Sequence, residues 1–446
     1  MRLEEKLEQL RRLAKPTSHE AGLERQLEYL SRLEPPPAPL PAQRVPCGIE
    51  HYVEGRFEAH ALGEFFLASQ ALPFGRPYGK YRIGDLSTTP LHPLDLFLEG
   101  ARLPEAPRLL YLDTETTGLA GGTGTCAFLI GVGAVEGSRF VVHQYFLRDY
   151  PEEKAILAAL AGMLEAYDGL VTFNGKTFDI PLLETRYALA RMKSPFTRLV
   201  HLDLLHPARR LWKLRLESCR LTHLEEHILG IHRDGDIPGS EIPAMYFEYL
   251  RTGNAQGLQP VFFHNALDIV TLAALTVEAA NVIHPARFEE GNERPAHPLD
   301  LFSLSRILER AGDSARSLTA CRQALSGGLP DSLEPCALWH LAWQHKRRRE
   351  YERAIEIWRE LTERRTDYAV EAFEQLAIHY EHRARDPRTA MELAEAAVER
   401  IQGSPAGGNP LALGDAVDCL RRLARRIHRL EGKVRRAEAA NQLDVS

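Results

Sequence analysis

The chain has 446 residues and a formal net charge of −6, with 26% charged and 44% hydrophobic residues. This length supports two or three domains with a large core, and the composition is that of a globular chain rather than a disordered one. The negative balance argues against a protein that coats nucleic acid through charge alone.

The six cysteines form no CxxC pair, and a chain of this size needs no disulfide staples. Free thiols in a reducing compartment are therefore expected. No apolar run approaches the ~20 residues of a membrane-spanning helix, so no membrane span is expected. The first residues, MRLEEKLEQLRRLAK, are charged and amphipathic rather than typical of a secretory signal. The expected location is the cytoplasm.

Two segments precede the first well-patterned region. Residues 1–43 predict an N-terminal helical segment and a stiff proline-rich linker, EPPPAPLPA, at 34–42. Residues 44–104 mix short apolar runs with glycine and proline. They predict an irregular, β-containing extension that packs on the domain after it.

Residues 105–290 form the next predicted domain. Strands are expected at about 108–113, 126–135 and 140–147, then a helix at about 152–166, a strand that ends at residue 173, a helix to about 192 and a strand near 198–202. Three antiparallel strands followed by alternating helices and strands predict an α/β fold with a mixed central sheet flanked by helices. Such a sheet places the end of its first strand beside later helices.

Two carboxylates end the first of these strands, in the sequence RLLYLDTETTGL. Asp113 and Glu115 share one face of the strand, because residues i and i+2 point the same way. Adjacent anions repel, and a divalent cation such as Mg²⁺ or Mn²⁺ is the usual remedy. For this motif alone a simple turn is the alternative, since Asp, Thr and Gly are turn residues.

A third carboxylate, Asp179, follows the strand that ends in FNGKTFDIPLL. It stands where a helix begins, so helix capping is the structural alternative. Residues 169–177 also nearly spell the phosphate-binding pattern GxxxxGK[ST]. Asn174 takes the place of the second glycine and Gly-Lys-Thr comes one residue late, so this pattern is rejected.

The segment HNALD at 264–268 begins a predicted buried helix. His264 and Asp268 project together, because positions i and i+4 share a helix face. One such pair is usually structural, but three acidic signals in this order are harder to explain by structure alone.

Residues 295–446 predict an all-α domain of TPR-like helical repeats. Two sets of residues recur at intervals of 37 and 35 and of 39 and 36: Leu304, Leu341 and Leu376, and Ala315, Ala354 and Ala390. This period suits paired-helix repeats. The arginine clusters at 346–349 and 421–429 are either solvated helix faces or a nucleic-acid track.

The order of the acidic motifs resembles that of the DEDD 3′–5′ exonucleases of the ribonuclease H-like superfamily. The stretch DTETTGL is especially close to their histidine-type branch. Asp113, Glu115, Asp179 and Asp268 match the four metal carboxylates of that family. The histidine branch typically places its histidine five residues before the last Asp. His264 stands four residues before it, which is the spacing of the tyrosine branch.

A narrower resemblance, to the YprB/MrfB-like bacterial exonucleases with a TPR-like C-terminal region, covers most of the chain from about residue 44. It is carried by DLL at 203–205, ARRLW at 208–212, LE at 224–225, GDIPG at 235–239 and HN at 264–265.

These resemblances imply a metal-dependent exonuclease that uses two ions, Mg²⁺ or Mn²⁺, with His264 as general base. Thr116, Gly118, Leu119 and Asn174 are expected to contact nucleic acid. The family likeness favours DNA over RNA, DNA repair, and a helicase or other repair protein as partner of the repeats. Two alternatives remain open: a structure-selective endonuclease, and a repeat scaffold that carries an inactive nuclease fold.

Overall fold

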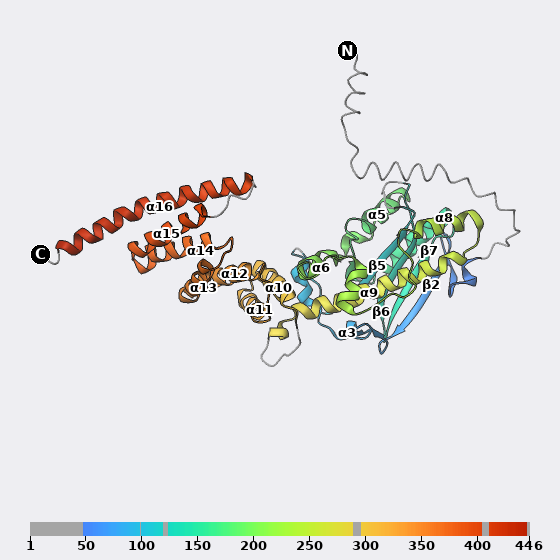
Figure 1. Cartoon of the computed structure of the whole chain (residues 1–446). Coiled ribbons are helices and arrows are strands. Elements are labelled where there is room, and N and C mark those ends of the chain that lie inside the picture. The colour runs from blue at the N-terminus through green and yellow to red at the C-terminus, as the bar shows by residue number, and fades with distance from the viewer. Residues whose placement is uncertain (1–47, 99, 119–123, 289–295, 404–409, 444–446) are drawn as a thin grey trace, which may run out of the picture.

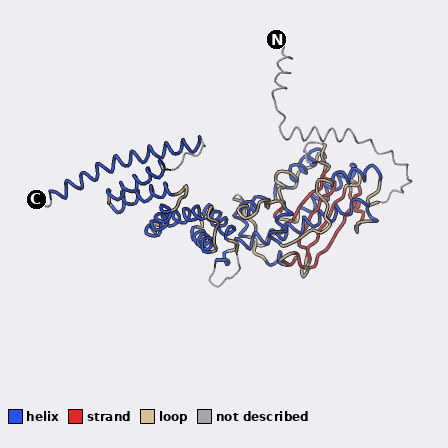
Figure 2. The backbone as a smooth tube through the Cα atoms, in the orientation of Figure 1, coloured by secondary structure: helices blue, strands red, loops and turns tan. Residues whose placement is uncertain are grey.

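The computed structural model describes residues 48–98, 100–118, 124–288, 296–403 and 410–443. An α/β part centred on a seven-stranded sheet is followed by a run of helices that extends away from it (Figures 1 and 2). The N-terminal helical segment and linker predicted for residues 1–43 lie outside the described residues.

The α/β part is built from short elements in a mixed order. Its strands are β1 (Gly55–His60), β2 (Gly63–Pro73), β5 (Leu109–Thr116), β6 (Ala127–Glu136), β7 (Arg139–Phe146), β8 (Gly169–Thr172) and β9 (Val200–Asp203), with β3 (Pro77–Tyr78) and β4 (Tyr81–Arg82) as a separate hairpin. Its helices are α3 (Asp85–Thr88), α4 (Glu153–Leu164), α5 (Asp179–Leu189), α6 (Leu205–Trp212), α7 (Leu221–Leu224), the π-helical η5 (Glu225–Leu229), α8 (Ile242–Thr252) and α9 (Gln259–Ile283).

The sheet has the strand order β1-β2-β7-β6-β5-β8-β9. Strands β5, β8 and β9 run parallel, whereas the pairs from β5 back to β1 are antiparallel. This arrangement confirms the predicted α/β fold with a mixed sheet. The segment 44–104, predicted as an irregular extension, contributes β1 and β2 to the same sheet, with β2 paired to β7.

Alternate side chains of β5 enter two different cores. Leu109 and Tyr111 pack on the side of the sheet covered by α9, whereas Leu110 and Leu112 pack on the side covered by α4 and α5. Because side chains alternate along a strand, Asp113 and Glu115 follow Leu109 and Tyr111 onto the α9 side. The core thus fixes the direction of both carboxylates.

Two glycines of β6 allow α9 to lie close against the sheet. A Cβ atom at Gly131 would lie 2.1 Å from Oδ1 of Asn265, and one at Gly133 would lie 2.3 Å from Cγ2 of Ile269. Both distances are far below van der Waals contact. Any larger residue at these positions would push α9 outward, and with it the face that carries residues 264 and 268.

Helix α9 also bears on the expectation of no membrane span. Residues 256–283 are long and apolar enough to cross a membrane by length and composition, but 78% of the apolar window is buried inside the fold. The core of the α/β part therefore accounts for this apolar stretch.

The C-terminal part is all-helical, as predicted. Its helices are α10 (Pro298–Arg310), α11 (Ser314–Ser326), α12 (Glu334–Arg347), α13 (Tyr351–Glu363), α14 (Ala369–His379), the π-helical η8 (Tyr380–Ala384), α15 (Pro387–Gln402) and α16 (Pro410–Leu443). Leu304, Leu341 and Leu376 are buried in α10, α12 and α14.

The second repeated set needs one correction. Ala354 and Ala390 are buried, but Ala315 is exposed. Ser317 takes the equivalent place in α11, where its hydroxyl donates to the carbonyl of Ser305 at 2.7 Å. The intervals between residues 317, 354 and 390 are then 37 and 36, which match the leucine set more closely.

Helix α10, the first helix of the C-terminal part, packs into the core of the α/β part. Leu304, Ile307 and Leu308 of α10 belong to the same buried cluster as α9. Arg215, after α6, forms an ion pair with Asp300 at 3.1 Å.

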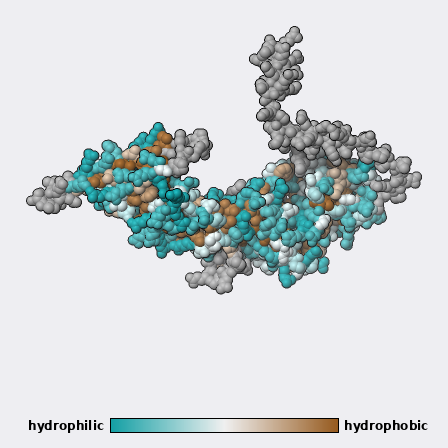
Figure 3. All heavy atoms as spheres, in the orientation of Figure 1, coloured by the Kyte–Doolittle hydropathy of each residue, from teal (hydrophilic) through white to brown (hydrophobic). Residues whose placement is uncertain are grey.

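The visible face of the described chain is mostly hydrophilic, with apolar residues in small groups (Figure 3). The five described cysteines are free thiols.

The arginine cluster at 421–429 has a structural role that neither alternative anticipated. Arg426, Arg429 and Lys433 of α16 lie 2.7–2.8 Å from the carboxylate of Glu381 in η8. The Glu381 side chain is fully buried. These contacts hold α16 against η8.

Candidate functional site

The end of β5 presents the first two predicted site residues. Asp113 pairs across the sheet with Gly131 and Glu115 with Leu129, and the register shifts by a bulge between Glu115 and Thr116. Bulges often lie beside active sites, where they redirect a side chain. The four residues from Asp113 to Thr116 are partly exposed, whereas the four before them are buried.

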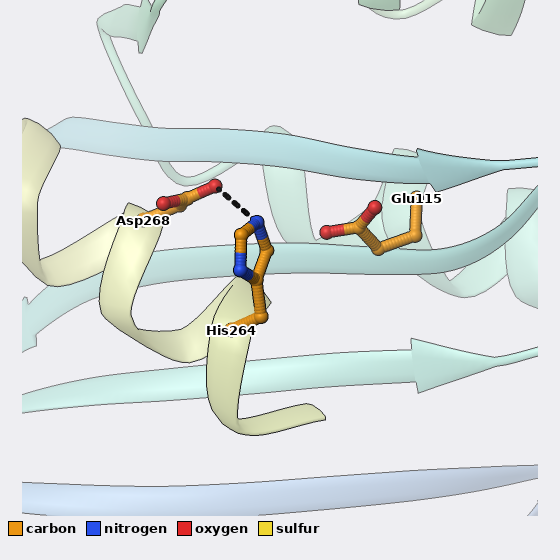
Figure 4. Close-up of side chains that lie close together, drawn as sticks. All are labelled: Glu115, His264 and Asp268. Atoms are coloured by element: carbon orange, nitrogen blue, oxygen red, sulfur yellow. Dashed lines mark ion pairs between the residues drawn. The ribbon is translucent and has the colours of Figure 1, made fainter. Parts of the chain in front are cut away.

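Helix α9 brings His264 and Asp268 to the same place. Nε2 of His264 lies 3.5 Å from Oδ2 of Asp268, and the carboxylate of Glu115 points toward the ring from β5 (Figure 4). One ligand atom from each of these three residues lies within 4.8 Å of the others. The i, i+4 spacing seen in the sequence thus places both side chains on the sheet-facing side of α9.

Asp113 is fixed by a buried amide that the motifs did not reveal. Nδ2 of Asn265 donates to Oδ2 of Asp113 at 3.0 Å, and Nε2 of Gln144 donates to Oδ1 of Asn265 at 3.0 Å. Asn265 is completely buried. In the sequence, only its position directly after His264 could have indicated a role for Asn265. Its contact with Gln144 on β7 depends on the tertiary fold.

Asp179 reaches the cluster from the other side of the sheet. It begins α5, and its Oδ1 accepts a hydrogen bond from the hydroxyl of Thr114 at 2.5 Å. Thr114 lies between Asp113 and Glu115 and points to the opposite face. Asp179 therefore lies beyond the tight group of three, yet close enough to Asp113 to influence its ionisation.

The electrostatics of the cluster favour a proton or a cation. Burial, followed by the charges of Asp268, Asp179 and Glu115, raises the pKa of Asp113 well above its usual range. Burial also raises the pKa of Glu115 to about 7 and that of Asp179 to about 6. Three carboxylates are thus disfavoured as anions unless positive charge is nearby.

A buried arginine, Arg233, forms a network of ion pairs beside α9. Arg233 pairs with Glu225 at 2.6 Å, with Asp236 at 2.9 Å and with Oδ1 of Asp268. Its side chain is only 7% exposed. Although burial lowers the pKa of the guanidinium, the surrounding carboxylates raise it above its usual range. Arg233 is therefore a permanent cation that fixes one oxygen of Asp268.

Asp236 connects this network to the histidine. Nδ1 of His264 lies 2.9 Å from both carboxylate oxygens of Asp236. Burial acts to raise the pKa of Asp236, but hydrogen bonds from Arg233 and His264 hold it below its usual range. Asp236 stands in the GDIPG segment, for which the sequence offered no role.

Of the remaining predicted contact residues, Thr116, Gly118 and Asn174 lie in the described part of the chain. The hydroxyl of Thr116 donates to the carbonyl of Gly118 at 3.1 Å, and Leu119 lies outside the described residues. Asn174 has a left-handed backbone (φ 64°), and its N–H donates to Asp203. Two exposed aromatic residues that the motifs missed, Phe178 and Phe263, directly precede Asp179 and His264.

The donor set fits divalent cations. Carboxylate oxygens are the hard ligands that Mg²⁺ and Mn²⁺ prefer, and the raised pKa values indicate that these groups gain from a nearby positive charge. Asp113, Glu115, Asp179 and Asp268 supply such oxygens from β5, α5 and α9.

The sheet order, its flanking helices and this acidic cluster define a ribonuclease H-like nuclease fold. In agreement, residues 110–280 match the RNase_H_2 family of the RNase_H superfamily. The chain is 30% identical over 291 residues to the uncharacterized protein YprB of Bacillus subtilis (strain 168), which covers 64% of this chain and 68% of YprB. The chain belongs to the family of YprB.

A comparison with solved structures found a match to the family B DNA polymerase of the archaeon Pyrobaculum calidifontis. The likeness has a TM-score of 0.33 at 13% identity and covers 56% of this chain. The chain spans about a third of the length of that polymerase, 34%.

Proposed function

We propose that this protein is a DEDD-type 3′–5′ exonuclease that hydrolyses phosphodiester bonds of nucleic acid, DNA in preference to RNA, in DNA repair. The observation that carries the proposal is the meeting of four carboxylates and one histidine at the end of β5. They come from segments as far apart as residues 113 and 268, and burial and mutual repulsion raise the pKa of three of them.

In this proposal Asp113, Glu115, Asp179 and Asp268 hold two divalent ions, Mg²⁺ or Mn²⁺. When bound, such a pair supplies positive charge to the scissile phosphate and to the leaving 3′ oxygen. Asp113 is central to the set, because its pKa responds to all three other carboxylates. Arg233 holds Oδ1 of Asp268 and leaves Oδ2 directed toward His264 and the cluster.

His264 takes the proton from the attacking water through Nε2. Asp236 accepts the hydrogen bond from Nδ1–H, which leaves the lone pair of the neutral ring on Nε2. This hydrogen bond also restrains rotation of the imidazole ring. Imidazole is the commonest general base in enzymes.

The two alternatives predict different products. A structure-selective endonuclease would release oligonucleotides, whereas an exonuclease releases nucleoside 5′-monophosphates. A scaffold with an inactive nuclease fold would release nothing. We place the helical part in this proposal as TPR-like repeats that bind a helicase or another repair protein, and we place the protein in the cytoplasm.

The test is a digestion panel of single-stranded DNA, duplex DNA and RNA, each labelled at the 5′ or the 3′ end, with Mg²⁺, Mn²⁺ or EDTA. We expect a ladder of shortened 5′-labelled fragments and early release of the 3′ label as mononucleotide, only with metal. Release of the 5′ label as mononucleotide before the strand has been shortened from its 3′ end would reverse the proposed polarity. No cleavage of any substrate with either metal would reject the enzyme.

A further inference from the structure

A second candidate binding surface lies on the helical part, away from the acidic cluster. Helices α10 and α12 border a groove of about 320 Å³. The residues that characterise it are Phe302, Arg306, Glu309, Trp339, Trp343 and Arg347. We refer to it as the α10–α12 groove.

Two tryptophans give the groove flat apolar surfaces. Trp339 and Trp343 stand one turn apart on α12, with ring centroids 5.8 Å apart and planes at 82°. Both are half-buried, whereas Trp212 and Trp358 are only 2% exposed. Trp212 and Trp358 are thus core residues, whereas Trp339 and Trp343 remain partly exposed in the groove.

Two arginines line the same groove as these rings. Arg306 is exposed and makes no ion pair within the described part of the chain, and its guanidinium lies 6.0 Å from the Phe302 ring. Arg347, 66% exposed, pairs with Glu309 at 2.5 Å. The ammonium of Lys346 lies 4.5 Å from the Trp343 ring. The groove itself is lined by two arginines and one carboxylate, Glu309, and this excess of positive charge favours an anionic ligand.

We propose that the α10–α12 groove binds a segment of single-stranded nucleic acid, with bases stacked on Trp339 and Trp343 and phosphates beside Arg306 and Arg347. Aromatic faces interleaved with cations are the usual means of holding single strands without sequence preference. A helical peptide would need a continuous apolar floor, which Arg306, Glu309 and Arg347 interrupt here.

This groove would hold the substrate strand at a distance from the site of cleavage. An exonuclease that removes one nucleotide at a time must keep hold of a shortening strand, and a second contact slows its dissociation. The inference concerns binding alone, so it can be tested without cleavage.

The test measures the anisotropy of labelled oligothymidylate on the full-length protein in EDTA, at two lengths of about 30 and about 6 nucleotides. Trp339→Leu/Trp343→Leu keeps apolar bulk but removes the ring faces, and we expect it to weaken binding of the long strand about tenfold or more. Arg306→Gln/Arg347→Gln should weaken binding and reduce its salt dependence. Arg388→Gln is the matched control, since Arg388 is 68% exposed and also pairs with one carboxylate, Glu438.

Unchanged affinity for the long strand in both double variants would overturn the inference and leave a protein partner as the occupant. An equal loss in Arg388→Gln would also overturn it, because only net charge would then matter. The Arg variants alter exposed side chains, so they remain informative if the Trp variant misfolds. Cleavage of the short oligonucleotide with Mn²⁺, measured in parallel, tests the proposed exonuclease separately.

Discussion

At the scale of single residues, the cluster combines groups that repel with groups that restrain them. Asp113, Glu115 and Asp179 have raised pKa values, whereas Asp236, one step further out, has a lowered one. The difference follows from Arg233, which contacts Asp236 and Asp268 but not the β5 carboxylates. This difference suits a site in which Asp113, Glu115 and Asp179, the inner acids, bind a cation, whereas Asp236, the outer acid, orients His264.

Neutralising one inner acid should abolish cleavage without unfolding the protein. We expect Asp179→Asn to reduce metal-dependent cleavage by orders of magnitude. In EDTA at pH 8 it should raise the Tm. The raised pKa of about 6 means that the ionised carboxylate is disfavoured in the folded state, and this penalty is present above pH 6. As the pH falls through 6 the wild type takes up the proton and the difference in Tm should shrink.

Calorimetry in EDTA across this pH range, together with single-strand digestion in Mn²⁺, checks both parts. Asp113→Asn should likewise lower metal-dependent cleavage and raise the Tm in EDTA at pH 8, because the pKa of Asp113 is also raised. Wild-type turnover in either purified variant would contradict the assignment of these residues as metal ligands.

Asp236 should act on the rate through His264. We expect His264→Ala to lower kcat roughly 10²–10⁴-fold. We expect Asp236→Ala to lower it about tenfold to a hundredfold, with KM and the stabilisation by Mn²⁺ little changed. Asp234→Ala, two residues away and exposed, is the matched control. Partial rescue by Asp236→Glu would support the positioning role, whereas a parallel loss of Mn²⁺ stabilisation in Asp236→Ala would indicate a structural one.

The sequence could predict the inner residues but not the outer ones. Asp113, Glu115, His264 and Asp268 lie in short motifs whose strand or helix spacing already places them on one face. Arg233, Asp236 and Asn265 acquire their partners only when the loop after η5 and strand β7 pack on α9. The spacing of residues within a single strand or helix does not predict contacts between segments that are distant in the sequence. The left-handed backbone of Asn174 was likewise not predicted, because the sequence around it was compared with the phosphate-binding pattern GxxxxGK[ST] instead.

At the scale of elements, the distance between α9 and the sheet decides whether a site exists. Gly131 faces Asn265 and lies opposite Asp113 in the sheet. A single methyl group there would displace the amide that holds Asp113. The packing of one helix on one strand thus controls the geometry of the cluster.

We therefore expect Gly131→Ala to destabilise the protein by about 1–3 kcal/mol, as overpacking typically does, and to lower cleavage strongly. Gly162→Ala is the control, because Gly162 lies in α4 with open space around it and alanine favours helix. Chemical denaturation and digestion assays compare the two. Normal activity in Gly131→Ala would show that α9 can shift without loss of the site.

The docking of α16 should depend on one carboxylate. Hydrogen bonds from Arg429 and Lys433 lower the pKa of Glu381 to about 2. A lowered folded-state pKa contributes stability above the unfolded value of about 4.3, and this contribution is lost as the pH falls toward 2. Glu381→Gln should accelerate hydrogen exchange in α16 at neutral pH, and the difference from wild type should fade below about pH 4.

Hydrogen exchange followed by mass spectrometry localises this effect. Exchange in β5 and α9 serves as the internal control and should not change. Equal protection of α16 in both proteins at pH 7 would show that the three cations contribute little to its docking.

At the scale of the whole molecule, the boundary between the two parts runs within the helical array rather than before it. Helix α10 buries Leu304, Ile307 and Leu308 in the cluster that contains α9. The sequence left open whether the C-terminal helices pack against the preceding domain. The spacing of apolar residues in α10 shows that one face is buried, but it does not show which part of the chain covers that face.

We expect a chain that ends near residue 290 to be insoluble or strongly destabilised, because it exposes the surface that α10 covers. A chain that ends at Gly328, after α11, should retain metal-dependent cleavage of short oligonucleotides. Thermal melting and digestion of both truncations against the full chain check this. A stable, active chain ending near 290 would show that α10 adds no essential cover to the α/β part.

The assembly of the cluster from β5, α5 and α9 also has a consequence for biosynthesis. Asp113 is translated 155 residues before Asp268, as their numbers show. A chain still attached to the ribosome carries the two β5 acids long before α9 can dock on Gly131 and Gly133. Until then the proposed metal ligands are not yet together, so a growing or prematurely ended chain is expected to lack the proposed cleavage activity. The order of the segments would thus delay the proposed activity until the fold is complete.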